Sequence, residues 1–406
     1  MWNTFWSVAS FDRIALDPAT RRLKRCASVE DYRRVARRRL PRGVFDYIDG
    51  GAEDEHTLAR NSAAYADYEF VPRVLRDMSS IDTSTTLFDT ELSMPLICAP
   101  TGFTRIAHSH GELAVARAAA RAGIPWSLST MGTHSIEDVA AVSEGPKWFQ
   151  VYTWRDRSMV ADLLRRAAEA GYRAVWLTVD TAVLGRRERD VRRGMTLPPK
   201  LGPGTLVDGA LHPAWTWDFL RHDPIIFANV AGYDTEDGSS AVSLAEHMHR
   251  QFDDALSWDD VEWLRSVWDG PIILKGVQSV ADAKQAVAEG VDAIALSNHG
   301  GRQLDHAPAP ISLVEPVRQE VGDQATIICD GGARRGSDVV KAVALGADAV
   351  SIGRPYLYAL AAGGERGVDQ LLEFFREGIE RTMALTGRNS IADIDRDLLV
   401  ARHHRA

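Results

Sequence analysis

The chain has 406 residues, of which 45% are hydrophobic and 25% charged, so it can bury a large core; disorder, collagen and coiled coil are excluded. At about 150 residues per domain this length suggests two or three domains, although a single decorated α/β barrel also accounts for it. The 47 basic and 56 acidic residues give a net charge of −9, which disfavours a nucleic-acid-binding protein.

Residues 1–90 are predicted to form a helical extension, not a separately cored domain. Basic residues crowd one part of this extension, between positions 21 and 42. They are Arg21, Arg22, Lys24, Arg25, Arg33, Arg34, Arg37, Arg38, Arg39 and Arg42. We interpret them as a solvated helix face. Attachment to an anionic surface, such as an acidic membrane leaflet, is the alternative.

The sequence shows neither a secretory signal nor a membrane span. Its opening residues lack the basic and apolar regions of a signal peptide, and no apolar run approaches the roughly 20 residues that cross a bilayer. The scattered Cys26, Cys98 and Cys329 are predicted to be thiols of a reducing compartment, neither disulfides nor metal ligands. We expect a cytoplasmic protein, with peripheral contact to the inner face of the cell membrane as the alternative.

Short apolar runs alternate with amphipathic helical patterns between residues 95 and 385. The predicted strands are 95–103, 126–132, 147–154, 173–182, 271–279, 293–301, 326–334 and 349–356. The predicted helices are 111–121, 136–142, 157–170, 258–268, 280–289, 311–321, 337–345 and 367–385. This alternation predicts a parallel sheet, and eight strands are the number that closes a TIM (β/α)8 barrel. An open doubly wound sheet is the alternative.

Every helix-to-strand connection after the first strand contains a glycine, the residue favoured where a helix ends in a left-handed conformation. These glycines are Gly123, Gly145, Gly171, Gly270, Gly290, Gly322 and Gly346. The fourth predicted strand begins at 173 and the fifth only at 271, so we expect a long loop insertion at about 185–256. Loops of this length are usually lids, binding elements or disordered segments.

Polar residues stand where the predicted strands end, and in a barrel these ends converge on one face. Gly331, Gly332 and Gly353, with Arg334 and Arg354, are typical of a barrel phosphate site, where backbone amides and guanidinium groups bind an anion. This implies a phosphorylated ligand or cofactor.

A second group of polar residues suits proton abstraction beside a carboxylate. His299 is a candidate base and Asp180 a candidate orienting carboxylate, while Arg187 and Arg302 can hold a carboxylate bidentately. Lys275, embedded in an apolar run, supplies fixed positive charge. Each residue also has a plain structural interpretation, such as a lysine at the barrel rim or a core histidine. Their common position at strand ends favours the functional interpretation.

These motifs resemble the FMN-dependent L-2-hydroxy-acid oxidising enzymes, the family of glycolate oxidase, bacterial L-lactate dehydrogenase and mandelate dehydrogenase. The resemblance runs from about residue 27 to the last helix. It rests on the segments 45–54 (FDYIDGGAED), 99–102 (APTG), 149–152 (FQVY), 177–180 (LTVD), 184–187 (LGRR), 275–276 (KG), 297–305 (SNHGGRQLD) and 330–332 (DGG). The run Ser-Asn-His-Gly-Gly-Arg on a barrel strand is very specific to this family.

The resemblance implies FMN as cofactor, no metal and a role for each matched residue. His299 is the catalytic base, and Asp180 stabilises its protonated form. The implied substrate-binding residues are Tyr47, Tyr152, Arg187, His299 and Arg302. The implied FMN-binding residues are Pro100, Thr101, Gly102, Ser129, Gln150, Thr178, Lys275, Ser297, Asp330, Gly331, Gly332, Arg334, Gly353 and Arg354. Family members commonly form tetramers, so a homotetramer of one 406-residue domain is expected.

Two positions depart from the plant oxidase pattern: Gly102 replaces an alanine beside the flavin, and Met131 replaces a tryptophan near the substrate. The first can alter oxygen access and the second leaves room for another side chain. The segments 212–218 (HPAWTWD) and 268–271 (WDGP) look closer to bacterial L-lactate dehydrogenases. The leading hypothesis is therefore oxidation of L-lactate to pyruvate, with electrons passed to a quinone or other carrier.

Three alternatives stay open. The first is an oxidase of the glycolate, lactate or mandelate type that uses O2 and produces H2O2. The second is a flavin-free phosphate-binding barrel, such as an aldolase with Lys275 as a Schiff base. The third is a non-enzymatic binding protein on the same barrel.

Overall fold

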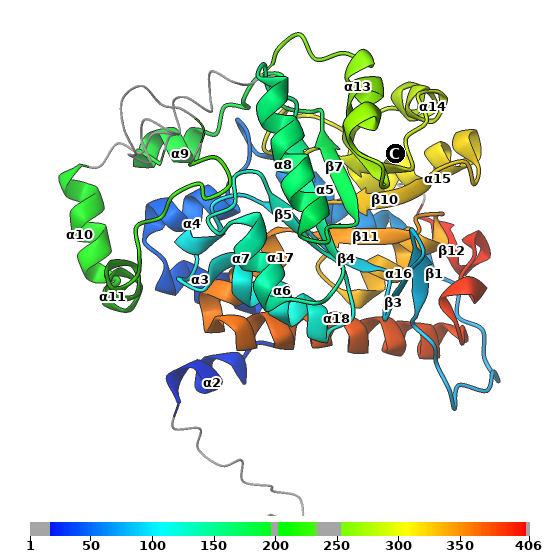
Figure 1. Ribbon diagram of the computed structural model, residues 1–406. Coiled ribbons are helices and arrows are strands. Elements are labelled where there is room, and N and C mark those ends of the chain that lie inside the picture. The colour runs from blue at the N-terminus through cyan, green and yellow to red at the C-terminus, as the bar shows by residue number, and fades with distance from the viewer. Residues whose placement is uncertain (1–16, 196–201, 232, 234–252, 403–406) are drawn as a thin grey trace, which may run out of the picture.

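Eight parallel strands close a barrel in the order β10-β11-β4-β5-β6-β7-β8-β9. The computed structural model describes residues 17–195, 202–231, 233 and 253–402 (Figure 1). The barrel strands are β4 (Leu96–Thr101), β5 (Trp126–Ser129), β6 (Lys147–Tyr152), β7 (Ala174–Thr178), β8 (Ile272–Val277), β9 (Ala293–Ser297), β10 (Thr326–Asp330) and β11 (Ala349–Ile352). The predicted TIM barrel is confirmed, and the open sheet is excluded because β11 pairs with β4.

The predicted helices are confirmed around this barrel. They are α6 (Gly111–Arg121), α7 (Ile136–Val142), α8 (Arg157–Glu169), α13 (Asp259–Val267), α14 (Val280–Ala288), α15 (Pro310–Val321), α16 (Gly336–Ala344) and α18 (Glu365–Thr386). The sequence missed α17 (Arg354–Gly363), whose first turn had been assigned to the eighth strand. Pro355 lies in that first turn, where its missing amide hydrogen costs nothing, so the strand ends and a helix begins.

The N-terminal extension is largely helical, as predicted, but it also contains strands. Its described helices are α2 (Pro18–Leu23), α3 (Val29–Arg39), α4 (Arg42–Asp49), α5 (His56–Ala63) and the 3-10 turn η1 (Ala64–Asp67). β1 (Tyr68–Phe70) pairs antiparallel with β12 (Leu399–Ala401), so the extension is tied to the end of the chain. β2 (Thr85–Leu87) and β3 (Thr90–Leu92) form a hairpin.

The hairpin closes one end of the barrel. Leu87 and Leu92 are buried in the same apolar cluster as Trp148 and Trp176, whose side chains fill the barrel interior. Phe88 lies beside Trp148, with 5.6 Å between ring centroids. Because this end is filled with apolar side chains, polar chemistry is left to the opposite end, where the strands terminate.

The insertion after β7 is partly helical, whereas a long loop was expected. It contains α9 (Glu188–Arg193), α10 (Pro203–Leu211) and α11 (Pro213–Arg221), which stand to the left of the barrel in Figure 1. Pro203 and Pro213 each occupy the first turn of their helix, a position that favours helix initiation. Parts of the predicted insertion, 196–201, 232 and 234–252, lie outside the described residues.

Two of the seven connecting glycines serve a different purpose from the one predicted. The φ angle is positive at the other five but not at Gly145 and Gly270. A Cβ at Gly145 would lie 2.7 Å from the Cβ of Ala120, and one at Gly270 would lie 2.9 Å from the Arg173 carbonyl oxygen. At these two positions glycine is required because of close packing and not because of the backbone conformation.

The basic N-terminal stretch is only partly the solvated face that was predicted. Arg22 and Arg39 donate from Nε to the carbonyl oxygens of Ala362 and Ala361, at 3.2 and 2.8 Å. Arg33 forms an ion pair with Asp49. Arg22 and Arg39 therefore fix the extension to α17, and Arg33 joins α3 to α4 within the extension. The others include the exposed Arg21, Lys24, Arg25, Arg34, Arg37, Arg38 and Arg42.

Two further observations concern the cysteines and the length of the helices. Cys26, Cys98 and Cys329 are free, and the last two are buried. Among the helices of the described residues, none is both long and apolar enough to span a membrane.

Candidate active site

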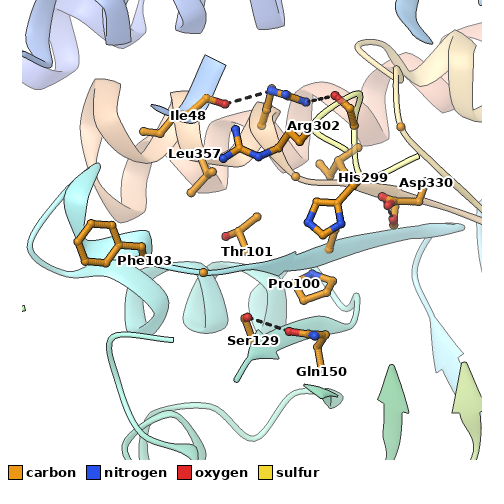
Figure 2. Close-up of a pocket in the computed structure, with 18 of the residues that line it drawn as sticks. Ile48, Pro100, Thr101, Phe103, Ser129, Gln150, His299, Arg302, Asp330 and Leu357 are labelled. Carbon is orange, nitrogen blue, oxygen red and sulfur yellow. Dashed lines mark hydrogen bonds between the residues drawn. The ribbon is translucent and has the colours of Figure 1, made fainter. Parts of the chain in front are cut away.

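A cavity opens at the carboxyl ends of the barrel strands (Figure 2). It is lined by α4 of the extension, by strand ends from β4 round to β11, and by residues of the insertion. Every predicted site residue lines it except Asp180 and Ser297. These two lie directly behind the lining, because Asp180 contacts His299 and Ser297 contacts Lys275.

His299 and Asp180 form a hydrogen-bonded pair. The distance from His299 Nδ1 to Asp180 Oδ1 is 3.0 Å; the Asp180 side chain is 3% exposed and that of His299 27%. Burial alone would raise the pKa of Asp180, but His299 and Lys275 together lower it. The carboxylate is therefore ionised and accepts the Nδ1 hydrogen, which leaves Nε2 with a free lone pair. Burial lowers the pKa of His299, against the attraction of Asp180, so the ring is neutral at pH 7.

The chain bends sharply after β9 to present His299. His299, Gly300 and Gly301 have φ angles of 56°, 65° and 75°, in the left-handed region. The His299 backbone amide donates to Ser297 Oγ at 3.1 Å, which fixes the start of this bend. A Cβ at Gly300 would lie 2.5 Å from Arg354 Nη1, and the φ of 65° is in the left-handed region, so both space and conformation favour glycine there.

Lys275 stands in a buried network that joins four strands. Its Nζ lies 3.1 Å from Asp330 Oδ2 and donates to Ser297 Oγ at 3.1 Å. The strand register aligns Asp330 with Ser297 on one side and Ser351 on the other, and both hydroxyls donate to the carboxylate. Burial acts against charge on Lys275, but Asp330 and Asp180 outweigh it and raise its pKa. A fixed cation results, where the sequence predicted one.

Two guanidinium groups lie close to the ring of Tyr47. Their Cζ atoms lie 5.9 Å (Arg187) and 5.1 Å (Arg302) from the ring centroid. Arg302 Nη1 donates to the backbone carbonyls of Tyr47 and Gly50, at 2.6 and 3.3 Å. Burial and the charge of Arg187 lower the pKa of Arg302. A bound carboxylate would relieve this repulsion, so the pair fits the predicted carboxylate site.

Ser129, Gln150 and Thr178 form a row of hydrogen-bonding side chains across β5, β6 and β7. Ser129 Oγ donates to Gln150 Oε1 at 2.8 Å (Figure 2), and Gln150 Nε2 donates to Thr178 Oγ1 at 3.0 Å. Figure 2 shows Ser129 and Gln150 below Pro100 and Thr101 of β4, and all three residues of the row line the cavity. Such a row suits the polar edge of a flat heteroaromatic ring.

The part of the cavity at the ends of β10 and β11 has the features of an anion site. Gly331 and Gly332 have φ angles of 131° and 84°, and a Cβ at Gly332 would meet the Asn61 carbonyl oxygen at 1.9 Å. Gly353 precedes α17, whose first amides have no side-chain cap. Arg334 also lines this part. Backbone amides, a helix N-terminus and one guanidinium fit the phosphate of FMN.

Arg354 has a structural task that the sequence did not reveal. Its guanidinium donates to the carbonyls of Ile48, Gly300 and Gly50, at 3.0, 2.8 and 2.7 Å. It lines the cavity, but these three bonds join the extension to the loop after β9. Burial lowers its pKa. The sequence predicted that the Arg354 guanidinium binds an anion. In the structure its hydrogen-bond donors are already used by backbone carbonyl oxygens.

Several lining or supporting residues were not predicted. Ser351 lies within an apolar strand and Phe227 within the insertion, and neither has a local signal. Asn298 Nδ2 donates to Asn61 Oδ1 at 2.7 Å, and Asn61 returns a bond of 2.8 Å. The position of Asn298 beside His299 in the motif could have indicated it, whereas its partner is 237 residues away.

Comparison with known proteins gives consistent matches over nearly the whole chain. The family described as FMN-dependent dehydrogenase matches residues 36–401. A putative L-lactate dehydrogenase of Mycobacterium tuberculosis is 46% identical over 385 residues, 95% of this chain and 91% of that protein. Glycolate oxidase 1 of Oryza sativa is 43% identical over 371 residues, 91% of this chain and 94% of that protein. The crystal structure of the monotopic membrane protein (S)-mandelate dehydrogenase has a TM-score of 0.89 and 40% identity, and the match covers 93% of this chain and 100% of that one.

Proposed function

The chain belongs to the family of FMN-dependent dehydrogenases and oxidises an L-2-hydroxy acid, and on this premise we propose that its substrate is L-lactate and its product pyruvate. The observation that carries the proposal is the His299–Asp180 pair, in one cavity with the guanidinium groups of Arg187 and Arg302. A base beside a carboxylate site is what removal of a proton from a 2-hydroxy acid requires.

Different residues bind different groups of the substrate. Arg187 and Arg302 hold the carboxylate, and Tyr47 and Tyr152 donate hydrogen bonds to the carboxylate and hydroxyl oxygens. His299 Nε2 takes the hydroxyl proton as the carbonyl forms, and Asp180 stabilises the resulting imidazolium. When bound, FMN supplies the acceptor for the C2 hydrogen and its two electrons. The balance is then complete: the hydroxyl proton goes to His299, the C2 hydrogen and two electrons would go to FMN, and the 2-oxo acid remains.

We assign the FMN site from the features described above. Pro100, Thr101 and Gly102 would lie along the ring system, and Ser129, Gln150 and Thr178 would bond its polar edge. Lys275 would add positive charge there. Ser297, Asp330, Gly331, Gly332, Arg334, Gly353 and Arg354 would surround the ribityl chain and phosphate. Lys275 already has a carboxylate partner, which argues against a neutral Schiff-base amine and against the aldolase alternative.

The electron acceptor that we propose is a quinone or another carrier. An oxidase that reduces O2 to H2O2 is the second candidate, because the rice relative is named a glycolate oxidase. The two are distinguished by reoxidation of the reduced enzyme. Fast reoxidation by a quinone analogue and slow reoxidation by air supports the dehydrogenase, and the reverse supports the oxidase.

We also propose peripheral contact with a membrane through α10 and α11. Neither helix has a buried residue. Their exposed apolar side chains are Leu206, Val207, Leu211, Trp217, Phe219 and Leu220. The Arg42 amide donates to Asp208 at 2.6 Å, so α10 adjoins the basic extension, whose exposed arginines suit anionic lipid. The solved relative, (S)-mandelate dehydrogenase, is a monotopic membrane protein.

Vesicle sedimentation tests this contact. The protein should sediment with vesicles containing phosphatidylglycerol more than with neutral vesicles, and Trp217→Ser with Leu220→Gln should release it. Protein that stays in the supernatant with both vesicles contradicts the membrane contact. A homotetramer, which the family resemblance implies, should elute at four times the chain mass in light-scattering chromatography.

The decisive test of the catalytic function is anaerobic reduction of the purified protein by a panel of hydroxy acids. The protein should be yellow with bound FMN and should bleach fastest with L-lactate. Bleaching by another hydroxy acid alone would correct the substrate. A protein that takes up FMN but is bleached by none would contradict the proposal.

A further inference from the structure

The segment that follows α11 returns from the surface to the barrel. Whereas α11 has no buried residue, Phe227 is 3% exposed and Val230 is fully buried. The Phe227 side chain lines the cavity that also contains His299 and Arg302. The insertion therefore contributes a wall to the active site.

Asn229 fixes this segment against the end of β5. Its Oδ1 accepts the Ile136 amide at 2.8 Å, and its Nδ2 donates to the Ser129 carbonyl at 3.3 Å. The Ala228 amide donates to the Gly132 carbonyl at 3.1 Å. Asn229 is 1% exposed, so these bonds are shielded from water. The position of Phe227 is thereby tied to a strand whose Ser129 lines the proposed FMN site.

A series of aromatic rings connects Phe227 with the carboxylate site. The ring centroids of Phe227 and Phe103 are 5.5 Å apart, and those of Phe103 and Tyr47 are 6.1 Å apart. Phe103 has a left-handed φ of 60°, and its amide donates to the Met131 carbonyl at 2.9 Å. The Tyr47 ring lies near both Arg187 and Arg302. The rings thus set the distance from the carboxylate site to Phe227.

The cavity has a charged part and an apolar part. Figure 2 shows Phe103 on the side away from His299 and Asp330. The apolar part is the set of lining residues joined through Phe103: its ring packs against Phe227, its amide donates to the Met131 carbonyl, and its carbonyl accepts the Ile106 amide. Ala107 and Leu184 also line the cavity. None of these named lining side chains is ionisable. A second carboxylate or ammonium group placed there would be buried without a partner, which is strongly unfavourable.

We propose that this apolar part receives the substrate's side chain and that Phe227 limits its length. The inference rests on the proposed function and makes it more specific. The substrates are 2-hydroxy monocarboxylic acids with short apolar side chains, and dicarboxylic or amino-substituted acids are rejected. Phe227 is the specificity-determining residue that the insertion supplies.

The test compares L-lactate with L-2-hydroxyoctanoate in anaerobic reduction of the FMN-loaded protein. Removal of the ring in Phe227→Ala opens space for several methylene groups, each worth about a fourfold change in affinity. We compare the kcat/KM for L-2-hydroxyoctanoate with the kcat/KM for L-lactate. The ratio of the first to the second should rise at least about tenfold in Phe227→Ala. Phe227→Trp narrows the space and should lower the ratio. Phe374→Ala, at a half-buried phenylalanine of α18 that does not line the cavity, is the matched control and should leave the ratio unchanged.

FMN content and the melting temperature show whether each variant is folded. If Phe227→Ala does not fold, Phe227→Leu should still raise the ratio several-fold. A wild-type protein that no hydroxy acid reduces contradicts the proposed function itself. A reducible wild type whose ratio is the same in the folded Phe227 variants overturns only this inference. A wild type that prefers L-malate to L-lactate also overturns it.

Discussion

Lys275 Nζ lies 3.1 Å from Asp330 Oδ2, across the strand β9 that separates β8 from β10. Both side chains are buried, and Ser297 of the intervening strand contacts both of them. The barrel therefore holds a cation at the cavity by enclosing its counter-ion. The same contact gives the pair a role in stability, beside the role proposed for Lys275 at the FMN site.

Replacing Lys275 should destabilise the protein before FMN is considered. In Lys275→Met the Asp330 carboxylate stays buried without its cation, which costs about 3–5 kcal/mol of unfolding free energy. Urea unfolding of the FMN-free protein measures this change. Lys284→Met, which removes a surface ion pair with Glu320, is the matched control and should cost no more than about 1 kcal/mol. Equal losses in the two variants would contradict the assignment.

His299→Gln should remove the base and leave the cofactor site intact. Flavin reduction by L-lactate should slow by about 10²- to 10⁴-fold, the usual contribution of a general base. Stopped-flow absorbance measures the rate, and the flavin spectrum measures bound FMN. His306→Gln is the matched control, because His306 also has a positive φ, 62°, but is exposed and does not line the cavity. Loss of FMN from His299→Gln would reassign His299 to a structural role.

The pH dependence of kcat/KM should report the His299–Asp180 pair. His299 must be deprotonated to act, and burial lowers its pKa from 6.5, so activity should fall only below that pH. The Asp180 charge acts in the opposite direction and raises this pKa. In Asp180→Asn the acid limb should therefore move to lower pH, while kcat falls by about 10²-fold or more because the imidazolium is less stable. An acid limb that moves to higher pH would contradict the pairing.

The sequence predicted the barrel well because its signals are local. Each strand is a short apolar run, and each following helix has an amphipathic period, so order and number could be counted along the chain. His299, Lys275 and Asp330 were found because strand ends in a barrel converge. The sequence placed Gly145 and Gly270 correctly in helix-to-strand connections, but it did not predict why glycine is needed there. A close approach to Ala120 or Arg173 leaves no signal in the neighbouring residues of the sequence.

Contacts between distant segments were the part that could not be predicted. Arg354 was assigned to the anion, yet it donates to Ile48 and Gly50, more than 300 residues earlier in the chain. Phe227 has no signal in its sequence context, and the bonds of its neighbours Ala228 and Asn229 to distant segments hold it at the cavity. Both depend on how the extension and the insertion close over the barrel, which no local pattern encodes.

Gly102 and Met131 are coupled by direct packing. A Cβ at Gly102 would lie 2.9 Å from Met131 Cβ and 3.3 Å from its carbonyl oxygen. Because the φ of Gly102 is not positive, alanine is compatible with the backbone and only this contact opposes it. Gly102→Ala should therefore push the β4 and β5 ends apart, cost about 1–3 kcal/mol of stability and change the access of oxygen to the FMN site.

A double-mutant cycle with Met131→Gly tests this coupling, since only glycine removes the opposing Cβ. The second substitution should recover about 1 kcal/mol or more of the stability lost in Gly102→Ala. Reoxidation of the reduced enzyme by air should change in Gly102→Ala and return toward the wild-type rate in the double variant. Gly204→Ala, in α10 with open space around it, is the matched control and should not lower stability. If the stability changes of the two substitutions are additive, the contact with Met131 is not the reason that position 102 requires glycine.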